Sequence, residues 1–165
     1  MQNKTFNRLL TFSLFFLAYW FFGNLYEEIV LTPNQLTDSY GKIIHWQGFF
    51  TLTNPMYYYI PFTQLAVLVP ILLFYKSDDA LEKRMLKRAS IFGILAIIIT
   101  IIIVTQVNMK LFFGDVEKFK NELHLLTIIW LIGNAVRLYL VGTSFYFVFK
   151  IYIYRQITEY KNNYR

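Results

Sequence analysis

One basic side chain, Arg137, stands near the middle of the last long apolar stretch of the sequence, residues 125–149. A charge at mid-depth in a bilayer costs at least a few kcal/mol, so it is retained where it faces protein, water or a counter-ion. Trp130, Asn134 and Arg137 are spaced i, i+4 and i+7, which places them on one face of a helix. This pattern predicts a polar pocket inside a helical membrane protein.

A second polar series closes the first apolar stretch, where Trp20, Asn24 and Glu27 have similar helical spacing and Glu28 follows directly. Either glutamate can supply a counter-ion for Arg137. Further polar side chains fall in the half of each stretch that we expect to lie outward, so we expect the pocket to open outward or into the outer leaflet. The candidate site residues are Trp20, Asn24, Glu27, Glu28, Asn54, Gln64, Asn108, Lys110, Trp130, Asn134 and Arg137.

The elements that must position these residues are four stretches long and apolar enough to span a bilayer, residues 9–26, 57–75, 89–109 and 125–149. Their apolar character all round excludes outer-membrane barrel strands, which alternate. We therefore predict an all-α, transmembrane, antiparallel (up-down-up-down) four-helix bundle in a single domain, residues 1–165. The helices are expected at about 7–30, 57–77, 86–113 and 121–155, with a structured outer loop between the first two.

Charge placement predicts the orientation of the chain. Eleven of the basic residues fall on the side that holds both termini and the 76–88 connection, against four on the other side. By the positive-inside rule both termini are cytoplasmic in a multi-pass protein of the inner or plasma membrane. The net charge of +6 therefore indicates topology and contact with membrane lipids, and does not indicate nucleic acid. Asp78, Asp79 and Glu82 are interpreted as a solvated part of this connection.

Several classes of chemistry are excluded by composition. The chain has no cysteine, which excludes thiol–disulfide exchange and thiolate metal sites. Its two histidines, His45 and His124, are too few and too far apart in sequence for a haem or a dinuclear centre. No phosphate-binding glycine loop, nucleophile elbow or HExxH pattern is present. We therefore predict no metal site and no cofactor.

Three short motifs occur in an order that is typical of a known group. They are Asn54-Pro55 ahead of the second helix, Thr105-x-x-Asn108-x-x-Leu111 closing the third, and Trp130-x-x-x-Asn134-x-x-Arg137 in the fourth. In these motifs the chain resembles the anthrone oxygenase-like family of small four-helix membrane proteins. The resemblance implies Asn and Arg residues around a central pocket and, for its characterised members, cofactor-independent oxidation of a polycyclic anthrone by dioxygen.

Within that hypothesis the catalytic candidates are Glu27, Asn134 and Arg137. Glu27 would deprotonate an acidic C–H or phenol, and Arg137 with Asn134 would stabilise the resulting enolate. Tyr26-Glu27-Glu28 departs from the family, which has small or apolar residues at this position, so the fold is carried over more firmly than the chemistry.

Three functions stay open at this point. The chain could be an enzyme or binding protein for a small hydrophobic or aromatic ligand, or a non-enzymatic accessory subunit that binds lipid or a partner protein. Transport is disfavoured, because few polar residues continue through the inner half of the helices. A homo-oligomer and a membrane-protein partner both remain open.

Overall fold

The computed structural model describes residues 3–163, and this part of the chain is helical with no strand. Four helical stretches are long and apolar enough to cross a membrane: Lys4–Thr37, Pro55–Lys76, Ala80–Leu111 and Leu123–Lys161. The prediction of an all-helical chain with four candidate membrane-spanning helices is therefore confirmed. Many large apolar side chains on these helices point away from the bundle, as contact with lipid requires.

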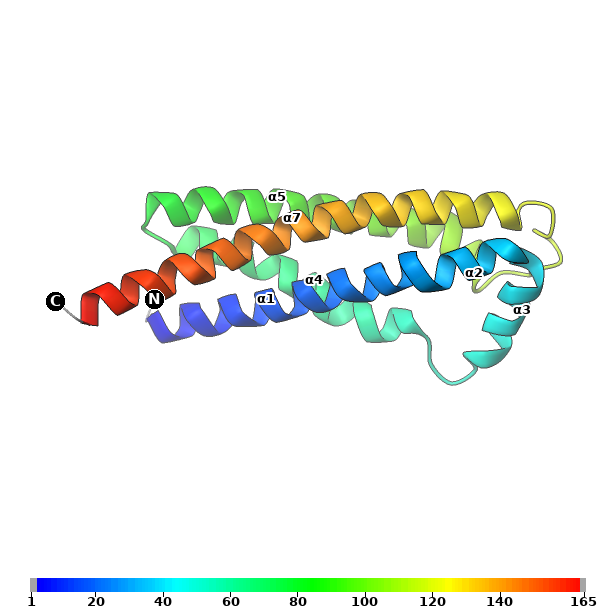
Figure 1. Cartoon of the computed structure of the whole chain (residues 1–165), viewed down its shortest axis with the longest axis horizontal. Helices are drawn as coiled ribbons and strands as arrows, with labels where there is room; N and C mark the ends of the chain where they lie inside the picture. The colour runs from blue at the N-terminus through cyan, green and yellow to red at the C-terminus, as the bar shows by residue number, and fades with distance from the viewer. Residues whose placement is uncertain (1–2, 164–165) are drawn as a thin grey trace.

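The long helices lie side by side (Figure 1). In chain order the elements are α1 (Asn3–Tyr26), the π-helical turn η1 (Glu27–Leu31), α2 (Thr32–Thr37), α3 (Ser39–Phe49), α4 (Pro55–Lys76), α5 (Ala80–Ile103), the π-helical turn η2 (Val104–Asn108), α6 (Met109–Leu111) and α7 (Leu123–Asn163). α1 packs on α4 and α7, and α5 packs on the same two helices.

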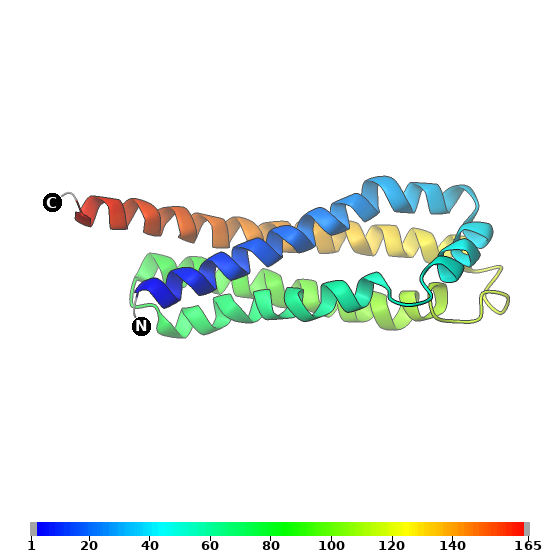
Figure 2. The same ribbon diagram turned by 90° about the horizontal axis from the view of Figure 1, so that it is seen from below.

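Both ends of the described chain lie at one end of the bundle, together with the α4–α5 connection; we name this the terminal end (Figure 1). The opposite end, which we name the far end, carries α2, α3 and the connection from α6 to α7 (Figure 2). α7 has 41 residues. At 1.5 Å per residue it is about 60 Å long, so it extends well beyond a hydrocarbon core of about 30 Å.

Two proline positions explain where the helices differ from expectation. The first helix was expected to end near residue 30, ahead of Pro33, but the chain continues through η1 into α2. Pro33 stands in the first turn of α2, where a missing backbone N–H is tolerated. In the interior of α4, Pro70 cannot donate to the carbonyl of Ala66, and the Ser13 hydroxyl of α1 donates to that oxygen instead, at 2.7 Å. The carbonyl that Pro70 leaves without its helical partner thus becomes a contact point between α1 and α4.

The far end is covered by α3, which packs over the end of α5 and the start of α7. Its Ile43 is fully buried against a cluster that includes Leu111 and Trp130. The Gln47 side-chain amide donates to the carbonyls of Leu111 and Gly114, both at 3.2 Å, so it caps the last turn of α6. The 32–56 segment is therefore mostly helical and packed, and only residues 50–54 of it form an extended link to α4.

A tyrosine also fixes α3 to the α6–α7 connection. The Tyr40 phenol donates a hydrogen bond to the carboxylate of Glu117, and the ammonium group of Lys120 lies 4.2 Å from the centre of the Tyr40 ring. Because the Glu117 carboxylate accepts this hydrogen bond, it favours the protonated phenol and raises the pKa of Tyr40 above its usual value. The contact holds α3 to this connection, in addition to the bond from Gln47 to the Gly114 carbonyl.

Candidate functional site

A buried polar cluster joins α1 and η1 to α7 near the far end. The Asn134 amide nitrogen donates to the Asn24 backbone carbonyl at 3.1 Å and to the Glu28 carboxylate at 2.7 Å. Its amide oxygen accepts two bonds from the Arg137 guanidinium, at 3.2 and 2.5 Å. Arg137 also lies 3.7 Å from the Glu27 carboxylate. Because Asn134 and Arg137 are almost completely buried, this cluster lies inside the bundle.

The first π-helical turn, η1, places the two glutamates of this cluster. Glu27 and Glu28 are its first residues, and the Thr32 hydroxyl closes the turn by donating to the Glu27 carbonyl at 2.9 Å. A π-helical turn inserts an extra residue into the helix, which rotates the following residues around the axis and often marks a functional site. Leu31 and Thr32 are thereby brought onto the same inner wall as Glu27.

A second π-helical turn, η2, lies across the bundle from the first. It carries Val104 and Asn108, and both line the same interior space as Glu27. The sequence showed neither π-helical turn, because a π turn has no composition signal of its own. The nearest hints were the polar residues at the end of each apolar stretch.

Between these turns lies a cavity of about 90 Å³. It is bounded by α1, η1, α2, α3, α4, α5, η2, the segment that follows α6, and α7. The residues that line it are Trp20, Asn24, Glu27, Leu31, Thr32, Gln35, Trp46, Asn54, Pro55, Met56, Tyr59, Ile60, Thr63, Thr100, Val104, Asn108, Phe112, Phe113, Trp130 and Arg137. Elements distant in sequence therefore meet around one space.

Three residues that line this cavity each carry a buried polar atom without a hydrogen-bond partner among the described residues: Asn24 Nδ2, Asn108 Oδ1 and Trp130 Nε1. These residues are 3%, 9% and 7% exposed. A buried polar group without a partner costs about 1–3 kcal/mol, so such groups are rare unless water or a ligand meets them. With these side chains turned toward the cavity, they would offer two donors and one acceptor to a molecule inside it.

The tryptophans and one tyrosine add to this wall. The sequence has three tryptophans, Trp20, Trp46 and Trp130, and all three line the cavity. Tyr59 also lines it, as Glu27 does. A methyl group at Gly23 would come within 2.3 Å of the Tyr59 hydroxyl, so the absence of a side chain at Gly23 lets that hydroxyl approach α1.

The sequence analysis did not identify Tyr59, Gly23 or Thr63 as site residues. The missing information was the angle at which α4 crosses α1, which no spacing within α4 encodes.

The structure brings most of the candidate residues together, though not all of them to the cavity wall. Trp20, Asn24, Glu27, Asn54, Asn108, Trp130 and Arg137 line the cavity. Asn134 and Glu28 lie behind this wall, where Asn134 bonds both Glu28 and Arg137. Gln64 and Lys110 are not among the lining residues. Lys110 instead lies 4.0 Å from Glu122 at the exposed rim of the far end.

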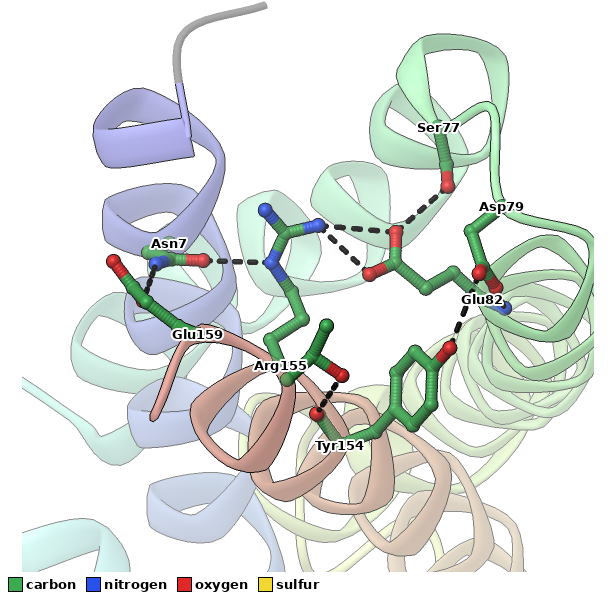
Figure 3. A network of polar contacts seen from close by, with 8 residues as sticks. Asn7, Ser77, Asp79, Glu82, Tyr154, Arg155 and Glu159 are labelled. Carbon is green, nitrogen blue, oxygen red and sulfur yellow. Dashed lines mark hydrogen bonds and ion pairs between the residues drawn. The ribbon is translucent and has the colours of Figure 1, made fainter. Parts of the chain in front are cut away.

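A second buried ionic cluster lies at the terminal end, and the sequence did not indicate it (Figure 3). Arg155 of α7 reaches both carboxylate oxygens of Glu82 on α5, at 2.8 and 3.0 Å, and its Nε donates to Asn7 of α1 at 2.8 Å. The Ser77 hydroxyl donates to the same carboxylate at 2.7 Å. Glu82 is 6% exposed. Its interpretation as part of a solvated connection is therefore wrong, because α7 extends far enough past the membrane segment to cover it.

The far-end site has the groups for hydrogen bonding and for electrostatic stabilisation of a bound molecule. A guanidinium and two carboxyl groups stand beside a small, mainly apolar cavity. Among the described residues no group of three or more His, Asp or Glu side chains is placed to hold a metal ion.

The comparisons with known proteins give no relative. No family model matches this chain, and neither does any curated protein or solved structure.

Proposed function

We propose that this chain is an integral membrane protein that binds a small, mainly apolar molecule in the far-end cavity. One observation carries the proposal: three buried polar atoms, on Asn24, Asn108 and Trp130, lack protein partners and belong to residues that line one cavity. Each such atom costs free energy that a bound molecule can recover, and three of them gather around one cavity.

Arg137 and Glu27 give this site its charged groups. The Arg137 guanidinium is held by Asn134 on one side and Glu27 on the other, so its orientation is fixed before a ligand arrives. Asn134 acts on the ligand only through Arg137, because its own amide groups are taken by protein atoms. Both Glu27 and Arg137 line the cavity and can contact the ligand directly.

The cavity faces outward in this proposal. Basic residues gather at the terminal end, where α1 begins, α4 joins α5 and α7 ends. The positive-inside rule places that end in the cytoplasm of a cell with an inner or plasma membrane, so the far end and its cavity lie on the outer side. A ligand would enter from the outer leaflet or from the external solution.

Oxidation of an anthrone is a narrower proposal on the same residues. Glu27 would take a proton from the CH2 group of the anthrone, and Arg137 would hold the enolate oxygen. Dioxygen would then oxidise that carbon to a carbonyl, which gives the quinone and one water molecule. The cavity of about 90 Å³ is smaller than the cavity of about 150 Å³ that holds a single benzene ring in another protein. A three-ring anthrone would therefore require α4 to move away from η1.

A second candidate function is that of an accessory subunit, in which the cluster only joins helices. The observation that favours it is the continuous hydrogen-bonded path from the Asn24 carbonyl through Asn134 to Arg137, which ties α1 to α7. A network of this kind stabilises a bundle without any ligand.

Native mass spectrometry of the protein in mild detergent tests these proposals. We expect the wild type to retain a small molecule of defined mass. Val104→Phe places a ring in the cavity and should lose that molecule, whereas Ile102→Phe adds the same ring on a half-exposed face of α5 and should keep it. Arg137→Leu should also lose it.

The outcomes separate the candidates. A spectrum without a small molecule but with a stoichiometric protein partner would support the accessory subunit and contradict the binding proposal. If a ligand is retained, oxygen uptake with added anthrone tests the narrower proposal, and uptake that is the same for Glu27→Gln as for the wild type would contradict it.

A further inference from the structure

We infer that the ligand's polar head is uncharged and carries both a hydrogen-bond acceptor and a donor, as an alcohol does. This inference rests on the proposed function and adds the chemical class of the ligand. It follows from the charges beside the cavity, from the three buried atoms that lack partners, and from the size of the space.

The charges beside the cavity disfavour an anionic head. Arg137 is the cation of the cluster, and it already has the Glu27 carboxylate at 3.7 Å and two hydrogen bonds to Asn134. Glu28 adds a second carboxyl group on the same Asn134 amide. An anionic head would therefore face the Glu27 carboxyl group, with Glu28 behind it, and one guanidinium whose charge is already compensated, in surroundings that screen charges poorly.

The three unpartnered hydrogen-bonding groups distinguish between the remaining kinds of polar head group. Asn24 Nδ2 and Trp130 Nε1 are donors, and Asn108 Oδ1 is an acceptor. A hydroxyl group has two lone pairs and one proton, so its hydrogen-bonding capacity matches two donors and one acceptor. An ammonium group offers protons only, and would leave both donors without partners. A ketone would satisfy the donors and leave Asn108 unmet.

The size of the cavity limits the rest of the ligand. The volume of about 90 Å³ is below the cavity of about 150 Å³ that holds one benzene ring in another protein. It accommodates a small head and the first carbons of one chain. Leu31, Ile60, Val104 and Phe113 supply apolar wall for that chain. Single-chain neutral amphiphiles fit this description, and two-chain phospholipids with charged heads do not.

The test measures binding of four probes with the same ten-carbon chain to the protein in lipid nanodiscs. The probes are decan-1-ol, decan-2-one, decyl sulfate and decylammonium, each compared at equal concentration in the membrane. Tryptophan emission is the readout, because all three tryptophans of the chain line the cavity. We expect decan-1-ol to bind saturably and at least about tenfold more tightly than either charged probe.

Two variants separate the donor from the acceptor. Asn108→Leu removes the acceptor, so it should weaken the binding of decan-1-ol about three- to tenfold and leave the binding of decan-2-one unchanged. Asn24→Leu removes a donor and should weaken the binding of both decan-1-ol and decan-2-one. Gln106→Leu is the matched control, since it removes an amide from the exposed face of the same π-helical turn and should change neither.

Each outcome decides one of the two proposals. If no probe gives a saturable change, and the cavity therefore holds only water, the proposed function fails. If decyl sulfate or decylammonium binds as tightly as decan-1-ol, the cavity binds ligands but the inference of a neutral head is wrong. The ranking on the wild type needs no variant, so it stands even where Asn24→Leu or Asn108→Leu does not fold.

Discussion

The two ends of the bundle each bury an arginine with a glutamate, yet they satisfy these groups to different degrees. At the terminal end Arg155 bonds both oxygens of Glu82, and Ser77 and Asn7 take further bonds (Figure 3). At the far end Arg137 lies 3.7 Å from Glu27.

Four buried side-chain atoms of the described residues have no hydrogen-bond partner, and three of them, on Asn24, Asn108 and Trp130, belong to residues that line the far-end cavity. The fourth, the Tyr19 hydroxyl on α1, does not line it, and none of the four belongs to the terminal-end cluster.

The difference teaches that a buried ion pair is by itself no sign of a functional site. A pair whose hydrogen bonds are all made within the protein joins helices, which is the role we assign to Glu82 and Arg155. A looser pair beside unmet donors and acceptors has capacity left for another molecule. The predictions below test this contrast, in order of decreasing effect on stability or binding.

The largest expected effect comes from removing each arginine in turn. Arg155→Leu leaves the Glu82 carboxylate buried without its partner and should lower the free energy of unfolding by about 3–5 kcal/mol. Arg137→Leu should cost less than half of that, because the carboxylate it would leave without a partner, Glu27, lines the cavity, yet it should abolish ligand retention. Thermal unfolding in mild detergent measures the first quantity and native mass spectrometry the second. Equal losses of stability in the two variants, with ligand binding intact in the folded Arg137→Leu protein, would contradict the difference in role that we assign to the two ion pairs.

A smaller effect is expected from Ser77→Ala. The Ser77 hydroxyl donates to the charged Glu82 carboxylate, and a hydrogen bond to a charged group contributes about 1.5–3 kcal/mol. Unfolding should show a loss in that range without any change in ligand binding. Ser90→Ala is the matched control, because the Ser90 hydroxyl bonds only the Leu86 carbonyl of its own helix. A similar loss in both variants would mean that Ser77 does not support the ion pair.

Gly23→Ala should affect binding more than stability. The new methyl group would meet the Tyr59 hydroxyl at 2.3 Å and push that ring into the cavity. Overpacking of this kind costs about 1–3 kcal/mol, and the displaced ring should weaken decan-1-ol binding. Gly48→Ala serves as the comparison, because nothing lies within 4 Å of its added methyl group. Wild-type affinity in Gly23→Ala would show that Tyr59 does not shape the cavity.

The smallest effect is expected from Tyr40→Phe. This variant removes the hydrogen bond from α3 to Glu117 and leaves the buried anchor Ile43 in place. Hydrogen exchange should become faster in α3, while the terminal-end cluster keeps the protection of the wild type. Faster exchange at both ends would mean that the two regions are coupled and not separate as we describe them.

The sequence predicted the helices better than the site. Four apolar stretches identify four candidate spans, because only a helix satisfies its own backbone in lipid. The polar spacing in the first and last stretches also identified Glu27, Asn134 and Arg137 as neighbours, and the structure brings them together. The sequence did not reveal Tyr59 on the cavity wall or the burial of Glu82, since both depend on how one helix crosses another.

The sequence by itself therefore determined that this protein is helical, that four helices can span a membrane, and that one arginine lies deep among them. Hydropathy and helical period are local properties, and they are present in the chain before it folds. Tertiary structure decided which arginine has its partners satisfied and which stands beside a cavity. That outcome depends on the crossing of α1, α4 and α7 and on two π-helical turns, which set distances of a few ångströms that no local pattern encodes.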